Sequence, residues 1–553
     1  MRPFQSFIHS PYSKLLLVLA VYLVLALPGI NQPVTDDEIY EIQNAEKLVA
    51  GESIQVFVPP LYDCVLTACI RTLGTSPWVF RVPGILSAVL TLLLLFLIGR
   101  TIFPGQGGVP AMLSALILAA SPAFIQGSLL VHIDNTILVP LILLWLYFVF
   151  MYCREGSIVY LSLSGAFFVI ALLAKFSTPV IIFPATLYYV HKRRRELFFP
   201  YFLILLLSAC AFFALWMLAA RVMGLSFWQP FVGALERWDI NMANIGLRSL
   251  AKSILALGIW FSPYLLLGVI MRTRRIWRGF LDDEDDISLF SLSACLFLVY
   301  LVISIVGYGF PKYYIPVLPM AILVLVGYLF KNGEEQVPVL KQVTLGAVFM
   351  FAYFLIFTKD PAYIYRYSLR EVLMTGSGGP ELTKTILMQL AVYTFPLVVF
   401  AVSRMLKGRS YLFKNYSFHA FILVLMFSYG ASLSVKQLYA DYQTNYSYGE
   451  KGTLELDRYL KENAKTRDRV LATKDVLYRL GRKGSYLSVA FWKDKGAVLR
   501  TLQERRTRFL VVSVPSQSGM FYKKILLSPE ARSILEKNFN RKEVGTYTVY
   551  ERK

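Results

Sequence analysis

The chain has 553 residues, of which 56% are hydrophobic and only 16% are charged. Soluble domains contain about 45–50% apolar and about 25% charged residues, so this composition excludes an ordinary soluble protein and predicts a membrane protein. The formal net charge of +21 could indicate a nucleic-acid partner. No nucleic-acid-binding motif accompanies it, and basic cytoplasmic loops explain the charge better.

Apolar runs recur along most of the chain. A run of about 20 apolar residues can cross a bilayer as a helix, and by this criterion we predict about thirteen spans. The first covers residues 14–27 and is interpreted as a retained helix, because no clear cleavage site follows it. Later spans are expected near 82–98, 109–123, 137–152, 158–173, 179–190, 201–220, 251–271, 287–306, 313–330, 345–357, 386–402 and 418–433.

Clusters of basic residues predict the orientation. Residues 191–195, 272–278 and 404–414 are rich in Lys and Arg, which favours the cytoplasmic side. They all fall on that side if the N-terminus is inside. Because each span moves the chain to the other side, the same count places three segments outside: the loop after the first helix, the loop at 228–239 and the chain beyond Lys436.

The pattern changes in the C-terminal part. Short apolar runs at 469–473, 485–489, 508–512 and 546–550 have strand length, and amphipathic stretches at 454–460 and 531–539 lie among them. This mixture predicts a small α/β domain. We therefore divide the chain into a transmembrane domain, residues 1–435, and an extracytoplasmic α/β domain, residues 436–553.

The first outer loop carries the most suggestive acidic residues. Asp36, Asp37 and Glu38 are consecutive, and Tyr40 follows. In a helix, either aspartate shares a face with Tyr40, and such a carboxylate could act as a general base. The alternative is structural: Thr35 caps a helix whose first turn is acidic. The two interpretations are compatible.

Other candidate residues lie at the predicted outer ends of spans. Asp134 is a second acid, with helix capping as its alternative role. Lys175 could bind a donor phosphate as a point charge, or could simply extend to the interface. The remaining candidates are Arg81, Arg237, Lys312 and Tyr313. Each alone would be interpreted as an anchor at the membrane interface. Together they place cations on the same side as the carboxylates, which is what a reaction with a phosphate leaving group requires.

Metal or disulfide chemistry receives little support. The five cysteines form no CxxC motif and the four histidines are scattered, so neither a disulfide scaffold nor a multi-histidine metal site is expected. The acidic run at 282–286 lies on the predicted cytoplasmic side and is interpreted as a solvated loop. No cofactor is implied, and whether a divalent metal assists is left open.

The ordered set of motifs resembles the membrane-embedded GT-C glycosyltransferases. The stretch from Asp36 to Tyr40, followed by Gly51 and Pro59-Pro60-Leu61, is similar to the first-loop signature of one branch. That branch contains the protein O-mannosyltransferases and the bacterial lipid A aminoarabinose transferase. Arg81, Asp134, Lys175 and Lys312-Tyr313 follow in the family's order. Val58 stands where the aminoarabinose enzymes have a lysine, so that donor and acceptor are not implied.

The resemblance implies a function and a location. A hydroxyl of a lipid, glycan or protein acceptor would attack a polyprenyl-phosphate sugar with inversion, at the periplasmic face of a bacterial inner membrane. Asp36 or Asp37 would be the base, and Tyr40 and Asp134 would support it. Lys175, together with Arg237 or Lys312, would hold the phosphate. The alternative function is a transporter or flippase for lipid-linked sugars, which would place polar residues deep within its spans.

Overall fold

The structure is a computed structural model of the chain. It describes residues 11–34, 36–54, 56, 58–103, 108–233, 262–278, 315–331, 338–358, 380–405, 418–438, 452–465, 467–481, 495–513, 526, 528–545 and 547–553. These residues form two compact units. The first unit comprises Met1–Ile30, Asn44–Thr75 and Val79–Leu438, and the second comprises Asn31–Gln43, Ser76–Trp78 and Tyr439–Lys553.

The first unit is helical. Its elements in chain order are α2 (Pro11–Ala26), η1 (Leu27–Gly29), α4 (Leu61–Leu73), α5 (Pro77–Ile102), α6 (Val109–Ala119), α7 (Pro122–Leu129), η3 (Ile133–Asn135), α8 (Leu138–Glu155), α9 (Ile158–Lys175), α10 (Ser177–Arg193), η4 (Arg195–Leu197), α11 (Phe198–Val222), α14 (Pro263–Arg278), α16 (Leu318–Lys331), α17 (Pro338–Phe357), α20 (Pro380–Met405) and α21 (Phe418–Leu438). Helix α3 (Asp36–Val49) begins in the second unit and ends in the first, and the first two residues of α5 also belong to the second unit.

Several of these helices can cross a membrane. Among the described residues, five are long and apolar enough, or six if α6 and α7 form one bent span. This confirms a multi-pass helical architecture, while the total of about thirteen spans stays a prediction. Predicted spans at 251–271, 287–306 and 313–330 lie partly or wholly outside the described residues.

One predicted span is broken. The run at 109–123 was expected to be continuous, but α6 ends at Ala119, α7 begins at Pro122, and the two helices meet at 62°. Proline lacks an N–H donor and would clash with the preceding turn of a continuous helix, whereas it fits the first position of a new one. Helix α7, which begins at this break, is followed directly by the turn that contains Asp134.

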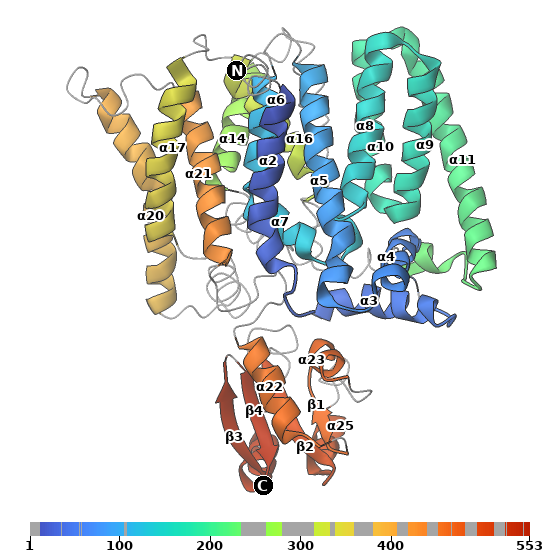
Figure 1. The fold of residues 1–553 in the computed structure, drawn as a ribbon, viewed down its shortest axis with the longest axis vertical. Helices are drawn as coiled ribbons and strands as arrows, with labels where there is room; N and C mark the ends of the chain where they lie inside the picture. Colours follow the sequence, from blue (N-terminus) through green and yellow to red (C-terminus); the bar gives the residue numbers. More distant parts are fainter. Residues whose placement is uncertain are drawn as a thin grey trace, which may run out of the picture. The chain divides into compact units, whose positions relative to one another are not determined.

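Helices α8 to α11 pack side by side (Figure 1). Gly156 follows α8 with φ of +68°, a conformation that suits glycine at a helix end. Ser157 then caps α9, because its hydroxyl accepts a hydrogen bond from the backbone of Val159 at 3.3 Å. These local signals close a helical hairpin. From this cap, α9 runs to Lys175.

The second unit contains a four-stranded sheet with the order β1-β2-β4-β3. Strands β1 and β2 are parallel, and β4 pairs antiparallel with both β2 and β3. The elements of the C-terminal chain are α22 (Thr453–Asn463), β1 (Arg469–Leu471), α23 (Lys474–Arg479), α25 (Lys495–Gln503), β2 (Thr507–Ser513), α27 (Pro529–Asn538), β3 (Phe539–Val544) and β4 (Tyr547–Arg552).

The sheet has a hydrophobic core on each face. Leu510 and Val512 of β2 pack with residues of α25 and α27, whereas Phe509 and Val511 pack with residues of α22 and α23. This alternation is the period of two that predicts a strand. The predicted strands at 469–473, 508–512 and 546–550 correspond to β1, β2 and β4, and residues 485–489 lie outside the described residues.

Strand β3 was not predicted. It has the sequence FNRKEV, and only its first and last residues are buried. Its hydrogen bonds to β4 on one side hold it at the sheet edge, where charged side chains are common because they discourage further pairing. The predicted boundary between domains at residues 435 and 436 stays a prediction.

Candidate active site

A fully buried carboxylate lies in the turn between α7 and α8. Asp134 belongs to η3, and its side chain is 0% exposed. The imidazole Nδ1 of His132 accepts a hydrogen bond from the backbone N–H of Asp134 at 3.2 Å and lies 3.5 Å from its Oδ2. Burying a carboxylate in an apolar surrounding is unfavourable unless it has a partner. The predicted capping role is not what the structure shows, since α8 begins without a side-chain cap.

The partner of Asp134 is Lys175. The ammonium Nζ of Lys175 lies 2.5 Å from Oδ1 of Asp134. Lys175 is the last residue of α9, where the helix dipole favours a cation. Its side chain keeps 17% of its surface exposed, so the ion pair has one buried and one partly accessible member. The structure thus brings together two residues that the sequence singled out separately.

Arg81 is buried beside the same segment. It lies near the start of α5 and is 1% exposed. One turn later, Gly84 packs so closely that a Cβ there would overlap the carbonyl oxygen of Ser128 and lie 3.3 Å from Cγ2 of Thr136. Thr136 is two residues after Asp134. Glycine at position 84 therefore lets α5 approach the turn, which places Arg81 in a helix packed against it.

Asn135 was not predicted as a site residue. It is 3% exposed, and neither its Oδ1 nor its Nδ2 has a hydrogen-bond partner within the described part of the chain. A buried amide without partners is unfavourable for stability, so such a residue requires an explanation. The sequence signal is only its position directly after Asp134, which also suits an ordinary turn.

The acidic first-loop residues lie in the first turns of α3. Asp36 and Asp37 open the helix, which confirms the helical spacing to Tyr40 that the prediction assumed. Ile39 and Ile42 are fully buried, and the side chain of Glu38 is only 1% exposed. Residues 31–43 belong to the second unit, whereas Arg81, Asp134 and Lys175 belong to the first. Thr35, Arg237, Lys312 and Tyr313 lie outside the described residues.

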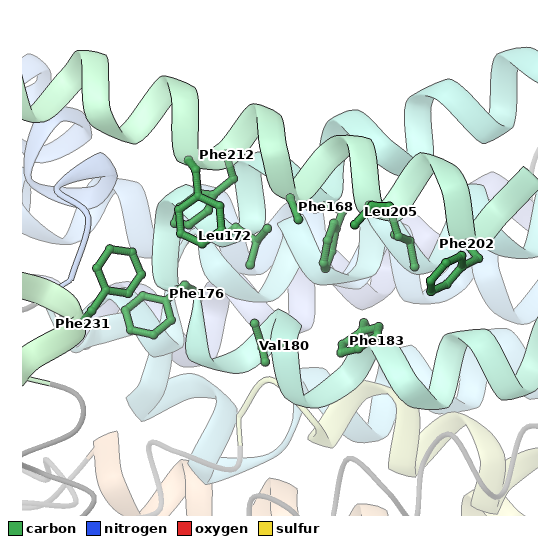
Figure 2. Close-up of a pocket in the computed structure, with 12 residues that line it drawn as sticks. Phe168, Leu172, Phe176, Val180, Phe183, Phe202, Leu205, Phe212 and Phe231 are labelled. Carbon is green, nitrogen blue, oxygen red and sulfur yellow. The ribbon is translucent and has the colours of Figure 1, made fainter. Parts of the chain in front are cut away.

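An apolar cavity adjoins the end of α9. It has a volume of about 300 Å³ and lies between α9, α10 and α11. Figure 2 shows side chains from these helices pointing into it, with Phe176 and Phe231 next to each other at one end. The centroids of their rings are 5.1 Å apart. The lining is entirely apolar: Phe168, Leu172, Phe176, Val180, Phe183, Phe202, Leu205, Leu206, Ala209, Phe212, Phe213 and Phe231.

The cavity and the ion pair are adjacent in the chain. Phe176, which lines the cavity, directly follows Lys175, which holds Asp134. Consecutive residues of the chain therefore hold the buried carboxylate and line the apolar cavity. Within the described ranges, no group of three or more His, Cys, Asp or Glu side chains is arranged to hold a metal ion.

Comparisons with known proteins bear on this arrangement. Residues 58–218 match the family model of dolichyl-phosphate-mannose-protein mannosyltransferases. This segment contains Arg81, Asp134 and Lys175. A comparison with curated protein sequences finds no match.

Solved structures show a similar fold. ArnT from Cupriavidus metallidurans bound to undecaprenyl phosphate is 15% identical, covers 98% of both chains and gives a TM-score of 0.57. Its apo state is 14% identical, covers 97% of both chains and gives 0.50. An oligosaccharyltransferase from Archaeoglobus fulgidus is 11% identical over all of this chain and 75% of its own, with a TM-score of 0.48.

The family match and the fold agree with each other. ArnT is a GT-C glycosyltransferase, and its structure aligns with this chain over nearly the full length of both proteins. The resemblance predicted from the sequence is therefore confirmed: residues 58–218 match a mannosyltransferase family model, and the fold is similar to that of ArnT.

Proposed function

We propose that this protein transfers a sugar from a polyprenyl-phosphate donor to the hydroxyl of an extracytoplasmic acceptor, with inversion at the anomeric carbon. The observation that carries this proposal is the position of Lys175. It is a partly exposed cation held by the buried Asp134, and the next residue lines an apolar cavity.

The donor follows from that arrangement. A phosphate is attracted by an ammonium point charge, and burial of isoprenoid carbons in an apolar cavity is favourable at roughly 25 cal/mol per Å². A polyprenyl phosphate combines both chemistries in one molecule. The structure of ArnT with undecaprenyl phosphate supports the same class of donor for this chain.

The proposed reaction is a single displacement. Asp36 or Asp37 accepts the proton of the acceptor hydroxyl, whose oxygen forms a bond to the anomeric carbon as the bond from that carbon to the phosphate oxygen breaks. The phosphate leaves with the bonding electrons, and Lys175 stabilises the developing charge. One displacement inverts the configuration. Tyr40 and Asp134 support the base, and Arg81, Arg237, Lys312 and Tyr313 assist in binding the substrate.

The location is part of the proposal. We infer a bacterial inner membrane with about thirteen spans, the N-terminus in the cytoplasm and the site at the periplasmic face. The C-terminal α/β domain, residues 436–553, would then lie in the periplasm. Its basic composition does not conflict with this, since long domains translocate largely regardless of charge.

The decisive experiment compares lipid extracts of cells with and without the protein by mass spectrometry. Loss of the transferase should cause a polyprenyl-phosphate sugar to accumulate while one glycan disappears from an envelope component. That result would identify donor and acceptor together. Unchanged lipid-linked sugars would contradict the proposal, and movement of labelled lipid across liposomes without a new glycosidic bond would indicate a transporter.

A further inference from the structure

The second unit contains a buried arginine that holds the segment leading to the acidic first loop. Arg479 is the last residue of α23, and its side chain is 8% exposed. Its Nη1 donates a hydrogen bond to the carbonyl oxygen of Val34 at 2.8 Å. Val34 is itself buried and precedes Asp36 by two residues.

Two carboxylates fix the orientation of this arginine. Its Nε donates to both carboxylate oxygens of Asp457 in α22, at 3.1 and 2.8 Å, and its Nη1 also donates to Asp475 at 2.9 Å. A planar guanidinium bound on several edges has little freedom to turn. Burial lowers its pKa, but the two neighbouring carboxylates outweigh this effect and the net pKa is raised. The group is therefore a permanent cation.

The hydrogen bond from Arg479 is unusual because its acceptor, the carbonyl of Val34, lies far away in the sequence. Within residues 439–553, Arg469 pairs with Glu504 and Arg541 pairs with Glu543, both at the surface and within the C-terminal chain. Arg479 instead reaches a backbone carbonyl 445 positions away. A carbonyl acceptor offers little for charge pairing, but it fixes the path of the main chain just before α3.

We propose that Arg479 is a positioning residue: it anchors the chain at Val34 and thereby sets the position of Asp36 and Asp37 for transfer. This inference rests on the proposed function. It makes the C-terminal domain part of the catalytic assembly and not only a platform for the acceptor. A base displaced by about 1 Å can lose about 100-fold in rate, so a fixed entry into α3 has direct consequences.

The test uses the full-length protein in detergent with Arg479→Lys and Arg479→Ala. Lysine keeps a positive charge beside Asp457 and Asp475 but cannot reproduce the fork that also reaches Val34. Arg479→Ala leaves the carboxylates of Asp457 and Asp475, which are 12% and 13% exposed, without their cation and serves as the more severe variant. Arg469→Ala is the matched control, because it removes an ion pair of the same unit that does not touch the first loop.

Two measurements are compared. Hydrogen exchange of peptides covering residues 31–43 should become about tenfold faster in Arg479→Lys, because the segment loses an anchor, while peptides from β2 and β4 keep their protection. The kcat for transfer should fall by about 10- to 100-fold with the donor KM unchanged. Arg469→Ala should change neither quantity.

The outcomes separate the two proposals. Unchanged exchange at 31–43, or full kcat in Arg479→Lys, would overturn the positioning role. Faster exchange throughout the C-terminal domain would also overturn it, since Arg479 would then serve only the stability of that domain. A wild-type protein without any transfer would refute the proposed function, while the exchange data would still decide whether Arg479 anchors the segment.

Discussion

The ammonium of Lys175 and the carboxylate of Asp134 are 2.5 Å apart although 41 positions separate them in the chain. Asp134 is fully buried in η3 and Lys175 ends α9. Each residue therefore depends on the other: the carboxylate offsets the cost of a cation at a largely buried position, and the cation offsets the cost of the buried acid. This relationship is the basis of the first prediction.

Replacing Lys175 should weaken donor binding. In Lys175→Ala we expect the donor KM to rise by about 10- to 100-fold, because a charge-assisted contact to phosphate, worth about 1.5–3 kcal/mol, is lost. Lys175→Arg should recover part of the affinity. Lys192→Ala is the control, as it removes an exposed cation near the end of α10. Initial rates against donor concentration measure the effect, and an unchanged KM in Lys175→Ala would assign Lys175 a purely structural role.

The acidic pair should be dispensable for folding and essential for transfer. We expect Asp36→Asn or Asp37→Asn to reduce kcat by about 10²- to 10⁴-fold, the range attributed to general base catalysis. The variant that loses activity identifies the base. Glu52→Gln, which changes an exposed carboxylate after α3, should keep full activity. If both aspartate variants turn over normally in single-turnover assays, the base lies elsewhere.

Replacing Asn135 by an apolar residue should maintain or raise the stability of the protein but reduce its activity. Its buried amide atoms have no hydrogen-bond partner among the described residues, so Asn135→Leu should keep or raise the melting temperature, since an apolar group of similar size is less costly there. If the amide binds substrate, the same variant should lose transfer activity by at least about tenfold. Thermal unfolding and kinetics on the same preparation check both parts. A destabilised but fully active variant would contradict this interpretation.

Gly84 should tolerate no side chain. In Gly84→Ala the added Cβ would overlap the carbonyl oxygen of Ser128. Because this oxygen belongs to the backbone, no change of side-chain rotamer can relieve the overlap. We expect a destabilisation of about 1–3 kcal/mol together with reduced transfer, because α5 must move away from the Asp134 turn. Leu86→Ala, on an exposed position of the same helix, is the control. A Gly84→Ala protein that melts like the wild type would refute the close approach.

Filling the apolar cavity should discriminate between donors by chain length. Ala209 lines the cavity, and Ala209→Phe would occupy part of its volume of about 300 Å³. We expect a higher KM for a long-chain polyprenyl donor and little change for a short-chain analogue, which has less hydrocarbon to bury. Leu207→Phe, at an exposed position on α11, controls for added bulk. Equal effects on both donors would mean that the tail binds elsewhere.

Much of the fold was predictable from local pattern. Long apolar runs predicted α5, α8, α9 and α11 because, in lipid, a span must satisfy its own backbone hydrogen bonds, and a helix does so locally. The alternation in β2 predicted a strand for a similarly local reason. Strand β3 was not predicted because its own side chains give no strand pattern. Its hydrogen bonds to β4 keep it in the sheet.

The sequence by itself determined that the chain is a multi-pass membrane protein, since long apolar runs encode this property locally, and its ordered acids and cations resemble those of the GT-C glycosyltransferases. Only the tertiary structure decided which of those residues meet. The Asp134–Lys175 pair depends on the break at Pro122 and on the packing of α9 against η3, and the contact of Arg479 with Val34 joins segments 445 positions apart. Such pairings follow from packing between distant segments, which no local pattern records.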